Sequence, residues 1–219
     1  LFERLGRHVC PMTEEELARV WVGGHRKLRR DPAFGPWVRR IGSIHLPVSG
    51  VTPFFYLVRA ICYQQLAGKA ARTIHRRFIE AVGCDVSPEN VLRLSESALR
   101  GAGLSGNKLG AIRDLAKKIQ SGELEVHDLE MRSDEEIVSR LTVVKGIGDW
   151  TAHMYLMFRL HRPDVWPVGD LAVRAGYARV QGMAEDPSKK ELRPLGDPYR
   201  PWRSAAAWYC YRALETELT

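Results

Sequence analysis

Apolar residues recur at a spacing of three to four along almost the whole of this chain of 219 residues. Almost nowhere do they alternate with a period of two for long enough to make a strand. Because an α-helix completes a turn every 3.6 residues, this spacing predicts an all-α protein. The expected helices are short and numerous, which favours a compact orthogonal bundle over a long coiled coil.

Capping signals mark where these helices begin and end. Thr13 with Glu16 and Ser133 with Glu136 have the capping-box spacing, and Thr52 precedes a first-turn proline. Glycines are expected to end helices in the left-handed conformation at Gly83, Gly103, Gly122 and Gly182. The expected helices cover residues 52–65, 68–82, 88–94, 95–101, 106–120, 133–142, 150–160, 170–181 and 201–217. The polar, proline-rich stretch 182–200 is expected to be a long surface connection.

Composition narrows the class of protein. The 33 basic and 26 acidic side chains leave a formal charge of +7, which suits a polyanionic partner but does not require one. There is no run of about eighteen apolar residues for a membrane span. The four cysteines, at Cys10, Cys62, Cys84 and Cys210, lack the spacing of a zinc ribbon or iron–sulfur site. We expect a soluble protein of a reducing compartment.

The segment from Thr142 to Asp149 contains Lys145, Gly146 and Gly148 between two expected helices. The two glycines allow a tight hairpin, and Ile147 between them can point into the core. The hairpin would leave backbone N–H groups bare at the start of the second helix, where one DNA phosphate can bind. An ordinary helical hairpin, with glycines serving geometry alone, is the alternative.

Four segments in order resemble the helix-hairpin-helix (HhH-GPD) DNA glycosylase superfamily. They are the hairpin read as KGIGDWTA, the loop 161–169 that ends at Asp170, residues 60–74 and residues 201–214. The resemblance implies one glycosylase unit over 1–219 with an active-site cleft between two helical lobes. Lobe A is expected at about 51–165, with the helix-hairpin-helix at 133–160, and lobe B at 1–50 plus 166–219.

Within the superfamily the chain is most similar to the alkylpurine branch, the 3-methyladenine DNA glycosylase II type. Trp150 occupies the position of the catalytic lysine of glycosylase/lyases, and only Cys210 lies beyond Asp170. These features imply a monofunctional enzyme of base excision repair, without lyase activity or an iron–sulfur cluster. The first 50 residues are too few and too helical for the N-terminal α/β domain of larger members, so we expect the compact form of the family. It is expected to flip 3-methyladenine and 7-methylguanine type purines and hydrolyse their N-glycosidic bonds, leaving an abasic site.

The resemblance assigns catalysis to Asp170, whose carboxylate would stabilise the oxocarbenium-like sugar. At about 4 Å and an effective dielectric of about 20, that attraction is worth about 4 kcal/mol, or about a thousandfold in rate. A helix N-cap is the structural alternative, and the two roles are compatible, because a capping aspartate with one free oxygen is held rigidly. Asp164 is expected to be a solvated turn residue, and Asp149 a helix cap.

Aromatic side chains are expected to stack on the cationic base. Trp150 and Tyr211 are the candidate walls, with Tyr63 and Trp208 as further candidates and a core position as the alternative for Trp208. Gln65 or Leu66 is the candidate wedge that fills the gap in the duplex. Otherwise, Leu66 belongs to the core and the glutamines cap a helix end.

The candidate phosphate-binding residues of the hairpin are Lys145, Gly146, Gly148 and Thr151. A structural Na⁺ or K⁺ at the carbonyls of Val143 and Gly146 is the one cofactor that the resemblance allows. The basic runs Arg26–Arg30 and His75–Arg77 either touch phosphates or are solvated helix faces.

The expected partner is double-stranded DNA with damaged bases. We expect a monomer, in the cytoplasm or nucleoid of a bacterium or in the nucleus of a eukaryote. The alternative functions are a non-catalytic module that binds damaged DNA and a glycosylase of different base specificity.

Overall fold

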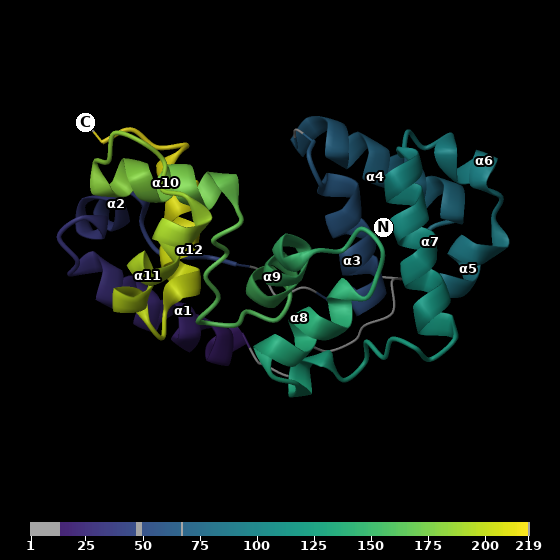
Figure 1. Ribbon diagram of the computed structural model, residues 1–219, viewed down its shortest axis with the longest axis horizontal. Helices are drawn as coiled ribbons and strands as arrows, with labels where there is room; N and C mark the ends of the chain where they lie inside the picture. The colour runs from purple at the N-terminus through teal and green to yellow at the C-terminus, as the bar shows by residue number, and fades with distance from the viewer. Residues whose placement is uncertain (1–13, 47–49, 67, 219) are drawn as a thin grey trace. The chain divides into compact units, whose positions relative to one another are not determined.

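A computed structural model describes residues 14–46, 50–66 and 68–218, and these contain helices but no strand (Figure 1). The prediction of an all-α protein is therefore confirmed. The α-helices are α1 (Glu14–Arg29), α2 (Phe34–Ile41), α3 (Pro53–Tyr63), α4 (Gly68–Val82), α5 (Pro88–Arg93), α6 (Glu96–Arg100), α7 (Gly106–Gln120), α8 (Asp134–Thr142), α9 (Asp149–Phe158), α10 (Leu171–Gln181), α11 (Lys189–Leu195) and α12 (Arg203–Ala213). Two short 3-10 helices are η2 (Leu129–Met131) and η3 (Asp197–Tyr199). None of the described helices is long and apolar enough to cross a membrane.

The described chain divides into two compact units. One consists of residues 50–155, and the other combines residues 14–46 with residues 156–218. The boundary at Tyr155 falls within α9, whereas the expected boundary of lobe A lies later in the chain, at about residue 165.

In the first unit, α3 packs against α4 and α7, and α5 also packs against α7. The α3 helix begins where the hydroxyl of Thr52 accepts a hydrogen bond from the N–H of Phe55, with Pro53 in the first turn. It is apolar on nearly every side, and Leu57 and Ile61 are fully buried in the core with Phe78 of α4. A helix that is apolar all round has to be enclosed by neighbours, as α3 is here.

In the second unit, α10 lies against α12, and both contact α2 (Figure 1). Close approach depends on Gly176 of α10, because a Cβ there would lie 2.1 Å from the carbonyl oxygen of Cys210. The alanines 205–207 of α12 are buried. Small residues at this contact bring the start of α10 close to the side chains of α12.

The local signals were largely correct. The capping box of Ser133 and Glu136 is confirmed, and Gly83, Gly103, Gly122 and Gly182 all have positive φ as expected. Thr13 of the other expected capping box lies outside the described residues. The expectation for 182–200 is wrong in part, because α11 starts within it at a capping box of Ser188 and Glu191. The Ser-Lys-Lys-Glu spacing is the helix-start signal in that stretch.

Candidate functional site

Asp170 lies at the start of α10, at the end of the loop that follows α9. Its Oδ1 accepts hydrogen bonds from the N–H groups of Ala172 (2.8 Å) and Val173 (3.1 Å), so its expected position as a helix N-cap is confirmed. The residue is only 6% exposed. A carboxylate held this way cannot rotate freely, and it lies where the positive end of the helix dipole favours negative charge.

Tyr211 of α12 contacts the other oxygen of this carboxylate. Its hydroxyl donates a hydrogen bond to Oδ2 of Asp170 at 2.7 Å. The tyrosine ring is half-buried, with its centroid 6.2 Å from that of Phe158. The expectation that capping would leave one oxygen of Asp170 free is therefore wrong, because the packing of α10 on α12 supplies a second donor. Tyr211, which was expected as a pocket wall, also orients the carboxylate.

The loop before Asp170 is fixed to the start of α12. Asp164 accepts hydrogen bonds from the guanidinium groups of Arg200 (2.7 Å) and Arg203 (2.8 and 3.0 Å). Ser204 accepts from the N–H of Val165 at 2.9 Å and donates to a carbonyl of the same loop at 2.6 Å. The expectation that Asp164 is a solvated turn residue is wrong, because two arginines distant in sequence pair with it.

The hairpin between α8 and α9 uses its two glycines differently. Gly146 has a φ of +84°, and a Cβ there would lie 2.8 Å from the Cβ of Ala111. Gly148 has no positive φ, and a Cβ there would meet nothing within 4 Å. Ile147 between them is 3% exposed and confirms the expected inward position. Geometry therefore requires glycine at Gly146 but not at Gly148, whose backbone faces open space at the start of α9.

Hydrogen bonds from Gln64 connect this hairpin to the end of α3. Its side-chain amide donates to the carbonyl oxygen of Gly146 at 2.9 Å and to Oγ1 of Thr151 at 3.0 Å. Because both partners can accept, the orientation of the amide is defined by its surroundings. Thr151 is 2% exposed and its hydroxyl accepts from Gln64, which disfavours a phosphate contact by its side chain. The spacing of the Q-Q pair does not reveal this bridge, which spans 82 residues of sequence.

One further contact fixes the hairpin, and the free groups around it bear on the proposed ligands. The N–H of Lys145 donates to Oδ2 of Asp114 on α7 at 2.8 Å, while the lysine side chain is exposed. The carbonyl oxygen of Gly146 keeps one lone pair beyond its bond to Gln64. A Na⁺ or K⁺ at the carbonyls of Val143 and Gly146 stays a prediction. No cluster of three or more metal-ligating side chains occurs among the described residues.

The turn that follows α3 carries the two wedge candidates. Gln65 is exposed and has a φ of +53°, and Leu66 is 39% exposed. The alternative that Leu66 is a core residue is therefore wrong. The last turn of α3 is held by Lys108 of α7, whose ammonium donates to the carbonyl of Cys62 at 2.9 Å. A rigid helix end thus presents two exposed side chains.

The other aromatic candidates are all half-buried. Trp150 is in the first turn of α9, and Trp208 packs edge-on against Tyr209 with ring centroids 5.0 Å apart. Trp208 is therefore only partly in the core. The guanidinium of Arg59 lies 4.9 Å from the ring centroid of Tyr63. None of these three residues is wholly enclosed in the core.

Comparisons with known proteins agree with these features. The family model of the HhH-GPD superfamily base excision DNA repair proteins matches residues 58–201. The chain is 36% identical to DNA-3-methyladenine glycosylase 1 of Schizosaccharomyces pombe over 163 residues, which are 73% of this chain and 72% of that protein.

Two solved structures are similar in fold. The S. pombe 3-methyladenine DNA glycosylase Mag1 in complex with abasic DNA has a TM-score of 0.84 and 30% identity, covering 90% of this chain and 98% of that one. The DNA-3-methyladenine glycosidase of Bacillus halodurans has a TM-score of 0.72 and 35% identity, covering 86% and 91%.

Proposed function

Since the chain belongs to the HhH-GPD superfamily of base excision DNA repair proteins, we propose that Asp170 is the carboxylate with which it excises alkylated purines from double-stranded DNA. The protein is an alkylbase DNA glycosylase, a hydrolase that cleaves the N-glycosidic bond and leaves an abasic site. One observation carries the assignment of Asp170: it is a buried carboxylate with both oxygens held by named donors.

Alkylation of a purine places a positive charge on the base, so the leaving group needs little protonation. The sugar acquires oxocarbenium character as the bond breaks, and the negative charge of Asp170 stabilises it. Two backbone N–H groups and the hydroxyl of Tyr211 fix the carboxylate before the substrate arrives. Such preorganisation avoids a reorganisation cost during the reaction, and the attraction is worth about 4 kcal/mol.

The enzyme is monofunctional, since Trp150 stands where glycosylase/lyases have a catalytic lysine. Without an amine at that position, water is the nucleophile. We place Trp150 and Tyr211 as the aromatic walls on which the cationic base stacks, with Tyr63 as a further contact. Each is half-buried, so each has ring surface left for a ligand.

The hairpin would bind one phosphate of the backbone. The first N–H groups of an α-helix, here those of Gly148 and Asp149, have no partner within the helix, and no side chain at Gly148 blocks them. Lys145 adds an exposed positive charge.

Gln65 and Leu66 would enter the base stack at the position of the flipped nucleotide. Both side chains are exposed on the turn after α3, and Lys108 anchors the last turn of that helix. We propose the nucleoid of a bacterium or the nucleus of a eukaryote as the compartment of the protein, because its substrate is DNA.

The experiment is incubation of the protein with methylated duplex DNA. Released bases are identified by chromatography, and abasic sites are cleaved with alkali. We expect free 3-methyladenine and 7-methylguanine from the wild type and about a thousandfold slower release by Asp170→Asn, which can still cap α10. If the wild type produced no more alkali-induced strand breaks than Asp170→Asn, the catalytic assignment would be refuted. Release of other bases alone would refute the alkylpurine specificity.

A further inference from the structure

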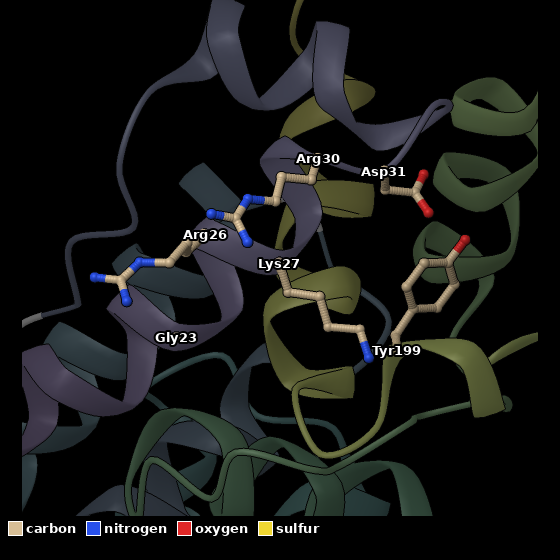
Figure 2. A pocket seen from close by; sticks show the side chains of 6 residues that line it. All are labelled: Gly23, Arg26, Lys27, Arg30, Asp31 and Tyr199. Carbon is tan, nitrogen blue, oxygen red and sulfur yellow. The ribbon is translucent and has the colours of Figure 1, made fainter.

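The second unit contains an open basic pocket that no part of the proposed mechanism uses. Its volume is about 480 Å³, and it is lined by Gly23, Arg26, Lys27, Arg30, Asp31 and Tyr199. Figure 2 shows the side chains of Arg26 and Arg30 extending in the same direction, while Lys27 reaches toward Tyr199. Three of these residues, Gly23, Arg26 and Lys27, belong to α1, Arg30 and Asp31 directly follow that helix, and Tyr199 closes the pocket from η3.

Within the part of the chain that the structure describes, no ion pair neutralises the two arginines of this pocket. Arg26 and Arg30 are exposed, and within the described part of the chain neither makes an ion pair or a side-chain hydrogen bond. Arg26 lies in the last turn of α1 and Arg30 directly follows the helix, so two like charges lie close together in the sequence. The single carboxylate of the pocket, Asp31, uses its Oδ1 to accept the N–H groups of Ala33 and Phe34 at 2.9 Å each. Among the described residues, the two guanidinium groups therefore have no polar partner that would compete with a ligand.

Lys27 is already positioned at the wall of the pocket. Its ammonium donates to the carbonyl of Arg200 at 2.8 Å, and an ammonium has two further protons to donate. Arg200 in turn pairs with Asp164 of the loop that leads to Asp170. The pocket is thus joined by two contacts to the loop that carries the proposed catalytic carboxylate.

We propose that this pocket binds the phosphodiester backbone of the DNA duplex, as a phosphate site of the second unit additional to the hairpin. The proposal rests on the proposed function, because a DNA glycosylase must hold the duplex while the base is extracted. Guanidinium groups donate in a planar fork that matches two phosphate oxygens, and a pair of them with an ammonium beside it suits the repeating charge of the backbone. The site binds backbone and is independent of base sequence.

The test compares two double variants that lose the same charge. Arg26→Gln/Arg30→Gln removes the arginines of the pocket, and Arg39→Gln/Arg40→Gln removes an exposed pair from α2. Affinity for a duplex with an abasic-site analogue is measured by fluorescence anisotropy at several salt concentrations. Each lost phosphate contact lowers the slope of log K against log salt by about 0.9. We expect the slope of the pocket variant to fall by about 2 and its affinity to fall about thirtyfold at ~0.15 M salt.

The expected result is a normal slope for the α2 variant and a reduced slope for the pocket variant, alike on duplexes of different sequence. Equal slopes in both variants, whether unchanged or equally reduced, would overturn the proposal, because the effect would then be absent or due to net charge alone. Far-UV circular dichroism checks that both variants are folded. Wild-type base excision is measured on the same preparation, so a failure of the glycosylase assignment is seen separately from a failure of the pocket.

Discussion

The hydroxyl of Tyr211 donates a hydrogen bond to Oδ2 of Asp170 at 2.7 Å, from the last turn of α12 to the residue directly before α10. With the two backbone N–H groups on Oδ1, it fixes both oxygens of a buried carboxylate. The contact depends on the close packing of these two helices, which Gly176 permits. The residue proposed to carry the negative charge of the reaction is therefore oriented from two directions.

We expect Tyr211→Phe to slow base excision about tenfold, since a hydrogen bond to a charged group is worth about 1.5–3 kcal/mol and its loss leaves Asp170 less well oriented. The ring remains, so stacking and DNA affinity should change little. Single-turnover rates and anisotropy measure the two quantities separately. Tyr209→Phe is the matched control, because that hydroxyl donates to the carbonyl of Gly42 and not to Asp170. An equal loss of rate in both variants would contradict a positioning role for Tyr211.

At the hairpin, we expect Gly148→Asp to lower the affinity for all DNA sequences about tenfold or more, because a carboxylate at this position repels a phosphate. The fold should be retained, since there is space for a side chain and aspartate is a good N-cap. Gly148→Ser is the uncharged control and should bind DNA more tightly than Gly148→Asp. Unchanged binding by Gly148→Asp in anisotropy would exclude a phosphate at this end of α9.

Substitutions of the neighbouring Gln64 and Gln65 should have different effects, the first on the stability of the protein and the second on its distortion of DNA. Gln64→Ala leaves Gly146 and Thr151 without their donor, so we expect the free energy of unfolding to fall by about 1–3 kcal/mol. Gln65→Ala, at an exposed position, should leave stability unchanged and reduce base flipping, seen as weaker fluorescence of 2-aminopurine opposite or beside the lesion. Urea denaturation measures the first effect. Normal flipping by both Gln65→Ala and Leu66→Ala would remove the wedge from this turn.

Burial of His75, with the nearby charge of Arg59, lowers its pKa from 6.5 to about 4. The unfolded chain therefore binds a proton between pH 6.5 and pH 4 that the folded chain does not, and stability falls as the pH is lowered through this range. The expected contribution is about 3 kcal/mol. His75→Phe should lose that part of the acid sensitivity when urea denaturation is compared at pH 7 and pH 4.5. The wild type and the variant share all other histidines. An identical pH dependence of their free energies of unfolding would therefore contradict the prediction.

The local structural features of this protein, such as the starts and ends of its helices, could be predicted from the sequence. The helix starts at Thr52 and Ser133, the four glycine ends and the inward position of Ile147 depend on hydrogen bonds and spacing within a few residues. The N-cap position of Asp170 belongs to the same class, because its donors are two and three residues away. The capping box that begins α11 is equally local, and it shows that a polar, proline-rich stretch does not exclude a helix.

The sequence by itself therefore determined the helical class, the hairpin and the place of Asp170 before α10. Only the tertiary structure decided what these elements touch. Tyr211 meets Asp170 across 41 residues of sequence, Gln64 meets Gly146 across 82, and Arg203 meets Asp164 across 39. Such pairs form because helices pack in one arrangement that brings their side chains within hydrogen-bonding distance. Periodicity shows which face of a helix is buried, but it does not specify which helix lies against that face.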